Sequence, residues 1–221
     1  MQNADAALNS VITGLQRAIT LGVEGANGTL SDADRQALAM EVQGIQSDLL
    51  NLANLSYQGS FVFAGTATQT APYISDSTGV HYVGNSAINQ ITVGNHFTVQ
   101  GNLPGSQLFS CPGHDVFQAM SDLIEGLQSG TGIDRAVNEV GDASRNISAQ
   151  RVFFGNSVNQ LNSQETYLNS ESTQLAQQQS TLGGADLTKV ISNLVNAQTS
   201  REATLEAVGR TQQSNLFDYL K

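Results

Sequence analysis

The chain has 221 residues, of which 39% are hydrophobic, 6% aromatic and 13% charged, and its net charge is −10. The nine Lys and Arg residues form no run, so the clustered cations that bind nucleic acids or anionic membranes are missing. No segment reaches the roughly 18 consecutive apolar residues of a transmembrane helix. Charged residues make up about half the roughly 25% usual in soluble domains. A surface of neutral polar side chains tolerates dense contact between copies, which favours assembly.

Two helices are predicted at the start of the chain. The first carries apolar residues at helical spacing, namely Leu8, Val11, Ile12, Leu15, Ala18 and Ile19. The turn-forming stretch "GANGTLSD" ends it, and Ser31 with Asp34 resembles a capping box. The second helix carries a heptad seam, namely Leu38, Val42, Ile45, Leu49 and Leu52. This pattern predicts an antiparallel helical hairpin or two stacked rods.

The character of the chain changes between Gly59 and about Gly113. The runs "FVF", "VHYV", "INQITV" and "HFTV" are β-branched and aromatic, and Gly, Asn, Asp and Ser separate them. Gly79 and the pair Gly94-Asn95 suit tight turns, and all three prolines of the chain lie in this region. We therefore expect a small antiparallel β module of four or five strands between helices, with Phe61 and Phe63 on one face of its first strand.

Helical spacing returns in "HDVFQAMSDLIEGLQSG" and continues from Ile133 to about Leu182. An apolar row with intervals of seven runs along this second stretch, namely Phe154, Leu161, Leu168, Leu175 and Leu182. Its heptad companions are mostly polar, so this helix needs another helix beside it. "GGAD" at 183–186 is expected to interrupt the helix, and a new one would carry Leu187, Ile191 and Leu194. A hydrophobic knob closes the chain, namely Leu216, Phe217, Tyr219 and Leu220.

These patterns predict a mainly α fold with an inserted β module. The expected divisions are helices of a rod domain at 1–58, the β hairpin and insert at 59–114, further rod helices at 115–182 and a terminal assembly helix at 183–221. The helical seams fit either the core of a monomeric bundle or a rod that pairs with neighbouring subunits. The terminal knob and the low surface charge favour the second interpretation.

No set of residues in the sequence predicts catalysis, a cofactor site or a metal site. Cys111 and His114 have a spacing that suits zinc, but only His81 and His96 remain as further strong ligands, and a turn is the better interpretation. Asp32, Asp34 and Asp76 lie at helix caps or turns, where structural roles explain them. A nucleophile elbow, a phosphate loop and an HExxH motif are all missing from the sequence.

Three segments, in this order, match the sequence pattern of one known family. The first is "GSFVFAGTATQTAPY", in which Gly59, Phe61, Phe63, Gly65, Thr66, Pro72 and Tyr73 match the family pattern. The second is "ISAQRVFFGNSVNQLN", which is shared with flagellins and matches through Arg151, Gly155, Asn159 and Leu161. The third is the closing stretch from Asp186, which resembles the terminal assembly helix of the family. Together the three segments resemble the family of flagellar hook-associated protein 3, the flagellin-like hook–filament junction proteins.

The resemblance implies an elongated helical rod with a small β domain and no catalysis or cofactor. It implies partners, namely other copies of the chain, hook-associated protein 1, flagellin and an export chaperone. It also implies an extracellular place in the flagellum, reached by type III export without a cleavable signal. The resemblance implies that the row from Phe154 to Leu182 packs the rod. It also implies that Leu216, Phe217 and Leu220 make the contact in the inner tube.

One departure from the family pattern concerns the N-terminus. Family members begin with a long helix that pairs with the C-terminal helix, whereas Met1 here leads into what resembles their second helical region. We therefore expect the seam from Leu187 to Leu220 to recruit another chain. Two alternatives stay open: a divergent or short flagellin that forms the filament, and an adhesin or binding module whose β insert recognises a ligand.

Overall fold

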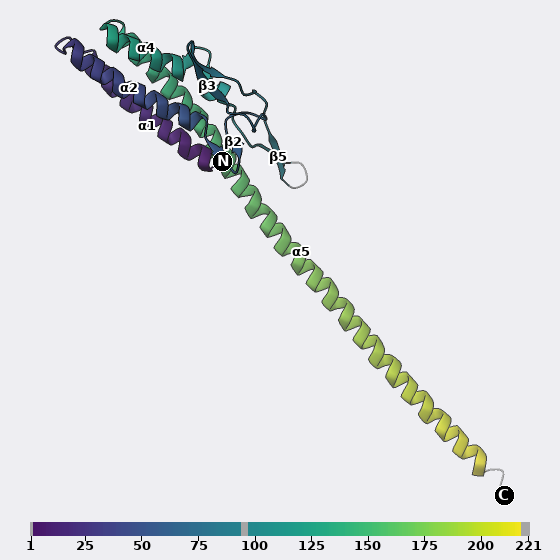
Figure 1. The fold of residues 1–221 in the computed structure, drawn as a ribbon. Coiled ribbons are helices and arrows are strands. Elements are labelled where there is room, and N and C mark those ends of the chain that lie inside the picture. Colours follow the sequence, from purple (N-terminus) through teal and green to yellow (C-terminus); the bar gives the residue numbers. More distant parts are fainter. Residues whose placement is uncertain (1, 94–96, 218–221) are drawn as a thin grey trace. The chain divides into compact units, whose positions relative to one another are not determined.

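The computed structural model describes residues 2–93 and 97–217, with the side chains of all of these except 97, 185, 186 and 211–217. Most of the described chain is helical, and short strands lie between the second and fourth helices (Figure 1). The helices are α1 (Gln2–Gly25), α2 (Asp32–Ala53), α3 (Gly105–Leu108), α4 (Val116–Ser129) and α5 (Ile133–Phe217). The predicted fold class, mainly α with an inserted β module, is confirmed.

The chain divides into two compact units, Met1–Gln164 and Glu165–Lys221, which we call the N-terminal unit and the C-terminal unit. In the N-terminal unit, α1 and α2 pack together as the predicted helical hairpin, and α2 also packs against α4 (Figure 1). The seam residues Val42 and Leu49 are buried, and Leu38, Ile45 and Leu52 pack against the same core. The first turn of α5 joins this core through Ile133 and Ala136.

The predicted capping box at the start of α2 is present. The Ser31 hydroxyl accepts a hydrogen bond from the Asp34 N–H at 3.2 Å, and the Asp34 carboxylate accepts one from the Ser31 N–H at 3.3 Å. Two backbone N–H groups of the first turn that lack a helical partner are thereby satisfied. Asp therefore performs here the role that Glu or Gln usually has in this motif.

The β module differs from the predicted set of four or five strands. Among the described residues, eight short strands form four separate two-stranded antiparallel sheets. The pairs are β1 (Ser56–Tyr57) with β2 (Ser60–Phe61), β3 (Tyr73–Asp76) with β4 (Gly79–Tyr82), β5 (Gln90–Val93) with β6 (Phe97–Gln100), and β7 (Ser110–Cys111) with β8 (His114–Asp115). The predicted turn at Gly94-Asn95 lies outside the described residues.

The prediction that "FVF" is one strand with two phenylalanines on one face is wrong. β2 ends at Phe61, and the chain turns after it, so that Phe63 is fully buried while Phe61 and Val62 are half-buried. The N–H of Val62 donates to the carbonyl of Leu55, which holds the turn against the end of α2. A single side chain of this run therefore enters the core.

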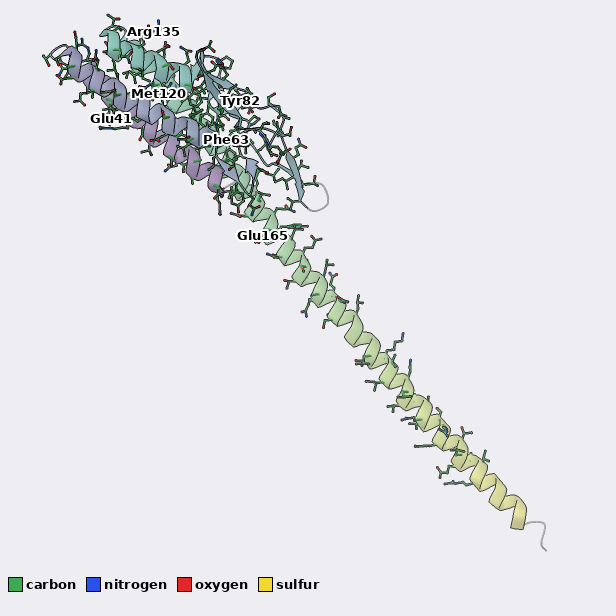
Figure 2. All side chains as sticks on the ribbon, viewed as in Figure 1. Glu41, Phe63, Tyr82, Met120, Arg135 and Glu165 are labelled. Carbon is green, nitrogen blue, oxygen red and sulfur yellow. The ribbon has the colours of Figure 1, made fainter. Side chains whose placement is uncertain are left out.

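An aromatic cluster connects the β module to the helices of the N-terminal unit. Phe63, Tyr73, Phe109 and Phe117 are each at most 2% exposed, although they come from four different segments. The ring of Phe109 meets Phe63 edge-on at 5.5 Å and Tyr73 at 5.7 Å, while Tyr73 lies 5.2 Å from Phe117. Such pairs add to the free energy gained by burying the rings. Figure 2 shows Phe63 where the β module meets the helices.

The predicted break at "GGAD" is also wrong, because the backbone of α5 stays helical from Ile133 to Phe217. A glycine inside a helix costs about 1 kcal/mol compared with alanine but removes no hydrogen bond from the helix. Proline would remove one, and the three prolines all precede α4. Gly183 and Gly184 therefore weaken α5 without ending it.

Candidate assembly surface

The C-terminal unit has a long apolar face that nothing in the described residues covers. Between Glu165 and Arg210 every described side chain except Leu168 is exposed. The large apolar residues are 50–70% exposed, namely Tyr167, Leu175, Leu182, Leu187, Val190, Ile191, Leu194, Val195, Leu205 and Val208. At about 100° per residue, the apolar residues between Leu187 and Val208 share one face of the helix, whereas Tyr167, Leu175 and Leu182 lie on the opposite side. Burial of one such side chain contributes about 1.5–3 kcal/mol, so the face between Leu187 and Val208 strongly favours a partner. The described ranges 2–93 and 97–217 include no helix with the length and hydropathy needed to cross a membrane.

The predicted packing row is divided between the two units. Phe154 is buried in the core of the N-terminal unit, and Leu161 is half-buried. Leu168 is half-buried, whereas Leu175 and Leu182 are 56% and 70% exposed. Leu187, Ile191 and Leu194 are exposed as well. The side chains of Leu216 and Phe217, and the whole of Leu220, lie outside the described residues. Assembly through this row stays a prediction.

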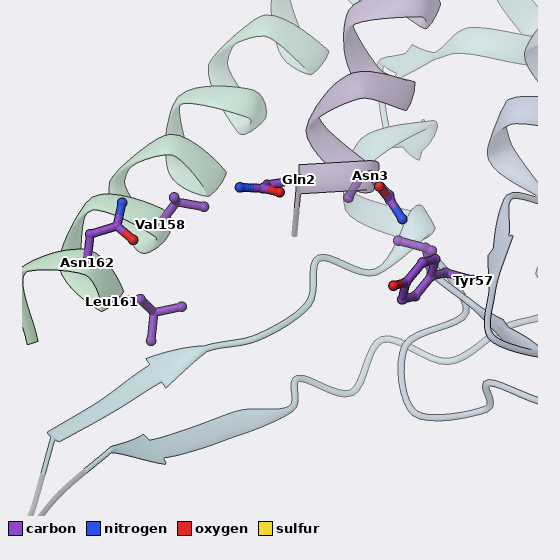
Figure 3. Close-up of a pocket in the computed structure, with 8 residues that line it drawn as sticks. Gln2, Asn3, Tyr57, Val158, Leu161 and Asn162 are labelled. Carbon is purple, nitrogen blue, oxygen red and sulfur yellow. The ribbon is translucent and has the colours of Figure 1, made fainter. Parts of the chain in front are cut away.

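An open pocket of about 340 Å³ lies in the N-terminal unit where α1 begins (Figure 3). It is lined by Gln2, Asn3, Ala4, Tyr57, Val62, Val158, Leu161 and Asn162. Its lining consists of amides and apolar groups with one phenol, and neither a carboxylate nor an imidazole is among them. This composition suits contact with another polypeptide better than acid–base chemistry.

Arg151 links α5 to the first turns of α1. Its Nε donates to one carboxylate oxygen of Asp5 at 2.6 Å, its Nη2 donates to the other at 3.1 Å, and its Nη1 donates to Oδ1 of Asn9 at 2.7 Å. This bidentate contact holds the pKa of Asp5 below its ordinary value, mainly through the hydrogen bonds from Arg151. The same contact raises the pKa of Arg151. Sequence patterns gave no sign of this pair, because the two residues are 146 positions apart.

Arg151→Gln is expected to lower the free energy of unfolding by about 1 kcal/mol, because both groups are partly exposed and solvent screens their attraction. Since the pKa of Asp5 is lowered on folding, its contribution is present above the unfolded pKa and is lost as the pH falls through the folded pKa. Urea unfolding at neutral and acid pH measures both effects. Arg145→Gln is the matched control, because Arg145 pairs only with Asp142 within one helix and should matter less. Equal losses for the two variants would contradict the proposed link between helices.

Three asparagine side chains hold the loop that contains the "GSFVFAGTATQTAPY" motif. Asn85 accepts the N–H of Thr66 at 2.8 Å and donates to its hydroxyl at 2.8 Å. Asn102 donates to the carbonyl of Gly65 at 3.1 Å. Asn54 accepts the N–H of Tyr73 and donates to its carbonyl, both at 2.9 Å. Sequence analysis missed these roles, although Asn is a residue type that often replaces backbone partners in turns.

Two glycines of this motif have structural reasons to be glycine. Gly59 has φ +78° in the two-residue turn that joins β1 to β2. Gly65 has φ +69°, and a Cβ there would lie 2.1 Å from the carbonyl oxygen of Asn85. In the second motif Gly155 and Asn159 are exposed on α5, and a Cβ at Gly155 would meet nothing within 4 Å. The described residues therefore give no steric reason for a glycine at position 155.

Of the described residues weighed as zinc ligands, Cys111 and His114 are neighbours, but His81 does not join them in a metal-binding group. Cys111 and His114 are opposite each other in the β7–β8 pair, while His81 hydrogen-bonds to Thr78 and lies 3.3 Å from Asp76. His96 lies outside the described residues. Within the described part of the chain, no three His, Cys, Asp or Glu side chains are placed to hold a metal ion.

Family models match both ends of the chain. The N-terminal helical region of bacterial flagellin matches residues 1–68, and its C-terminal helical region matches residues 137–220. The chain belongs to the flagellin family. The first match spans α1, α2 and the first motif, and the second spans most of α5 with Arg151 and the exposed face.

Relatives within this family include both junction proteins and filament proteins. Flagellar hook-associated protein 3 of Escherichia coli is 28% identical over 98% of the chain and 76% of the relative. A flagellin of Listeria monocytogenes is 24% identical over 97% of the chain and 71% of the relative. The crystal structure of FlgL from Xanthomonas campestris has the same fold, with a TM-score of 0.72 and 18% identity over 81% of this chain and 94% of that one.

Proposed function

We propose that this protein is a structural component of the bacterial flagellum that joins the hook to the filament and performs no catalysis. The observation that carries the proposal is the similarity to hook-associated protein 3 along nearly the whole chain. The flagellin-type helical regions at both ends point to the same organelle.

The mechanism that we propose is self-assembly through the C-terminal unit. Its exposed face, from Leu187 to Val208, packs against helices of neighbouring subunits and loses its contact with water. Assembly is therefore directed by one face of one helix.

The proposed partners are other copies of the chain, hook-associated protein 1 on the hook side, flagellin on the filament side, and an export chaperone before assembly. A chaperone fits the same argument, because an exposed apolar helix needs cover until it reaches its site. We further propose export through the flagellar type III system to an extracellular position.

The rival within the same family is a short flagellin, which the similarity to the Listeria protein favours. The two functions differ in what the purified chain builds. A junction protein is expected to bind the ends of isolated hooks and stop, whereas a flagellin is expected to grow long filaments alone. Electron microscopy of purified protein, with and without isolated hooks, distinguishes them. Long filaments without hooks would refute the junction role.

A second rival is a binding module in which the β module recognises a ligand. Deleting residues 74–112 is not a clean test, because Leu108 and Phe109 belong to the core. Surface variants are cleaner: Ile74→Ser and Ile91→Ser change side chains that are 46% and 45% exposed on two different hairpins. A junction protein with these changes still binds hook ends, and loss of hook binding would favour the rival.

A further inference from the structure

The connection between α1 and α2 contains the single Asn-Gly dipeptide of the sequence, Asn27-Gly28. Both residues are exposed, and a Cβ at Gly28 would meet nothing within 4 Å. The N–H of Gly28 finds no hydrogen-bond acceptor among the described residues, so it faces solvent. The backbone nitrogen next to the Asn27 side chain is therefore open to water and to base.

Thr29 holds the side-chain carbonyl of Asn27 from two directions. Its backbone N–H donates to Oδ1 of Asn27 at 3.2 Å, and its hydroxyl donates to the same atom at 2.9 Å. Donors placed in this way stabilise the negative charge that develops on an oxygen when a nucleophile adds to its carbon. The turn is closed by a hydrogen bond from the N–H of Leu30 to the backbone carbonyl of Asn27 at 3.1 Å.

We propose that Asn27 is a self-modification site, at which the side-chain amide is converted to aspartate and isoaspartate by attack of the Gly28 nitrogen. The Gly28 N–H loses its proton to solvent base, and its nitrogen forms a bond to Cγ of Asn27. The charge that develops on Oδ1 is held by Thr29. The bond from Cγ to Nδ2 then breaks, and ammonia leaves with a proton from water. Water opens the resulting cyclic imide at either carbonyl, so no oxidant, metal or cofactor is required.

The product changes the charge of this end of the N-terminal unit. Each of the five arginines in that unit already faces a carboxylate, and the first lysine of the sequence is Lys189. A new carboxylate at position 27 therefore finds no unpaired cation among the described residues of its unit. Isoaspartate also adds a methylene to the main chain, which disturbs the turn hydrogen bond from Leu30.

Incubation of the full-length chain in mildly alkaline buffer tests the proposal. Peptide mass spectrometry of the segment between Arg17 and Arg35 follows Asn27, and an isoaspartyl methyltransferase detects the isoaspartate product. We expect Asn27 to convert before Asn85 and Asn169, which precede serines, and to yield both products. Conversion at Asn169 while Asn27 remains intact would overturn the proposal.

Two variants test the role of the turn itself. Gly28→Ala fits the open space at this position and is expected to slow conversion strongly, because the added methyl group hinders the attacking nitrogen. Thr29→Val keeps the β-branched shape and the backbone donor but loses the hydroxyl, and should slow conversion roughly two- to tenfold. An unchanged rate in either variant would refute the mechanism. In urea the unmodified chain should convert more slowly than when folded, and faster conversion in urea would refute the contribution of Thr29.

Discussion

Replacing Leu187 and Leu194 with aspartate is expected to abolish self-association of the chain and to leave its N-terminal unit folded. The two leucines are 62% and 56% exposed, so neither supports the described structure from inside. Each substitution removes from the assembly the free energy gained by burying a leucine, which is about 1.5–3 kcal/mol. The unpaired carboxylate that replaces it adds a desolvation cost in the apolar contact. We expect the association constant to fall by more than about tenfold for each substitution.

Sedimentation velocity over a concentration series measures the association, and far-UV circular dichroism checks the helix content. The matched control is Asn196→Asp with Ala203→Asp, which adds two charges at the same spacing of seven residues. At about 100° per residue, these positions lie on the opposite side of the helix. An equal loss of association in the control would show that charge, and not the apolar face, is responsible.

Phe109→Ala is expected to lower the free energy of unfolding of the N-terminal unit by about 3–5 kcal/mol. Phe109 is fully buried and contacts Phe63 and Tyr73 edge-on, so its removal leaves a cavity between the β module and α4. The rigid helices on one side and the short sheets on the other cannot collapse to fill this space. The variant should therefore lose the aromatic cluster before it loses α1 and α2.

Guanidinium unfolding followed by tyrosine fluorescence measures this loss, because the chain has no tryptophan and Tyr73 lies inside the cluster. Burial also raises the pKa of Tyr73 far above its ordinary value, so Phe109→Ala should let this phenol ionise at lower pH. Tyr167→Ala is the control, since Tyr167 is 59% exposed and its loss should stay within about 0.5 kcal/mol. A loss below about 1 kcal/mol for Phe109→Ala would contradict the role of the cluster.

Local patterns predicted the helical parts of the fold well. The heptad seam with Val42 and Leu49 and the capping box of Ser31 and Asp34 are local patterns, because their residues are only three to seven positions apart. The structure confirms both the seam and the cap. The exposed row at Leu187, Ile191 and Leu194 was also visible as a periodicity, although the sequence does not state what covers it. The predicted helix break at Gly183 was wrong, because one glycine destabilises a long helix too little to end the helix.

Contacts between distant segments could not be predicted. The cluster of Phe63, Tyr73 and Phe109 forms only after the chain has folded back on itself, and none of these spacings is periodic. The same holds for Asp5 with Arg151. β1 was missed because Ser56 and Tyr57 form only a two-residue strand, whose pairing is set by the turn at Gly59 and not by hydrophobic alternation.

Hydrogen exchange of the backbone amides between Glu165 and Arg210 tests the central claim most directly, namely that this helix is stabilised by assembly. A helix without a packed partner opens easily, so these amides should exchange rapidly in the dilute chain. When the chain is bound to isolated hooks, the same amides should become protected by at least about tenfold, while those of α2 and α4 stay unchanged. Exchange between Glu165 and Arg210 that is equally rapid in the bound state would contradict the account.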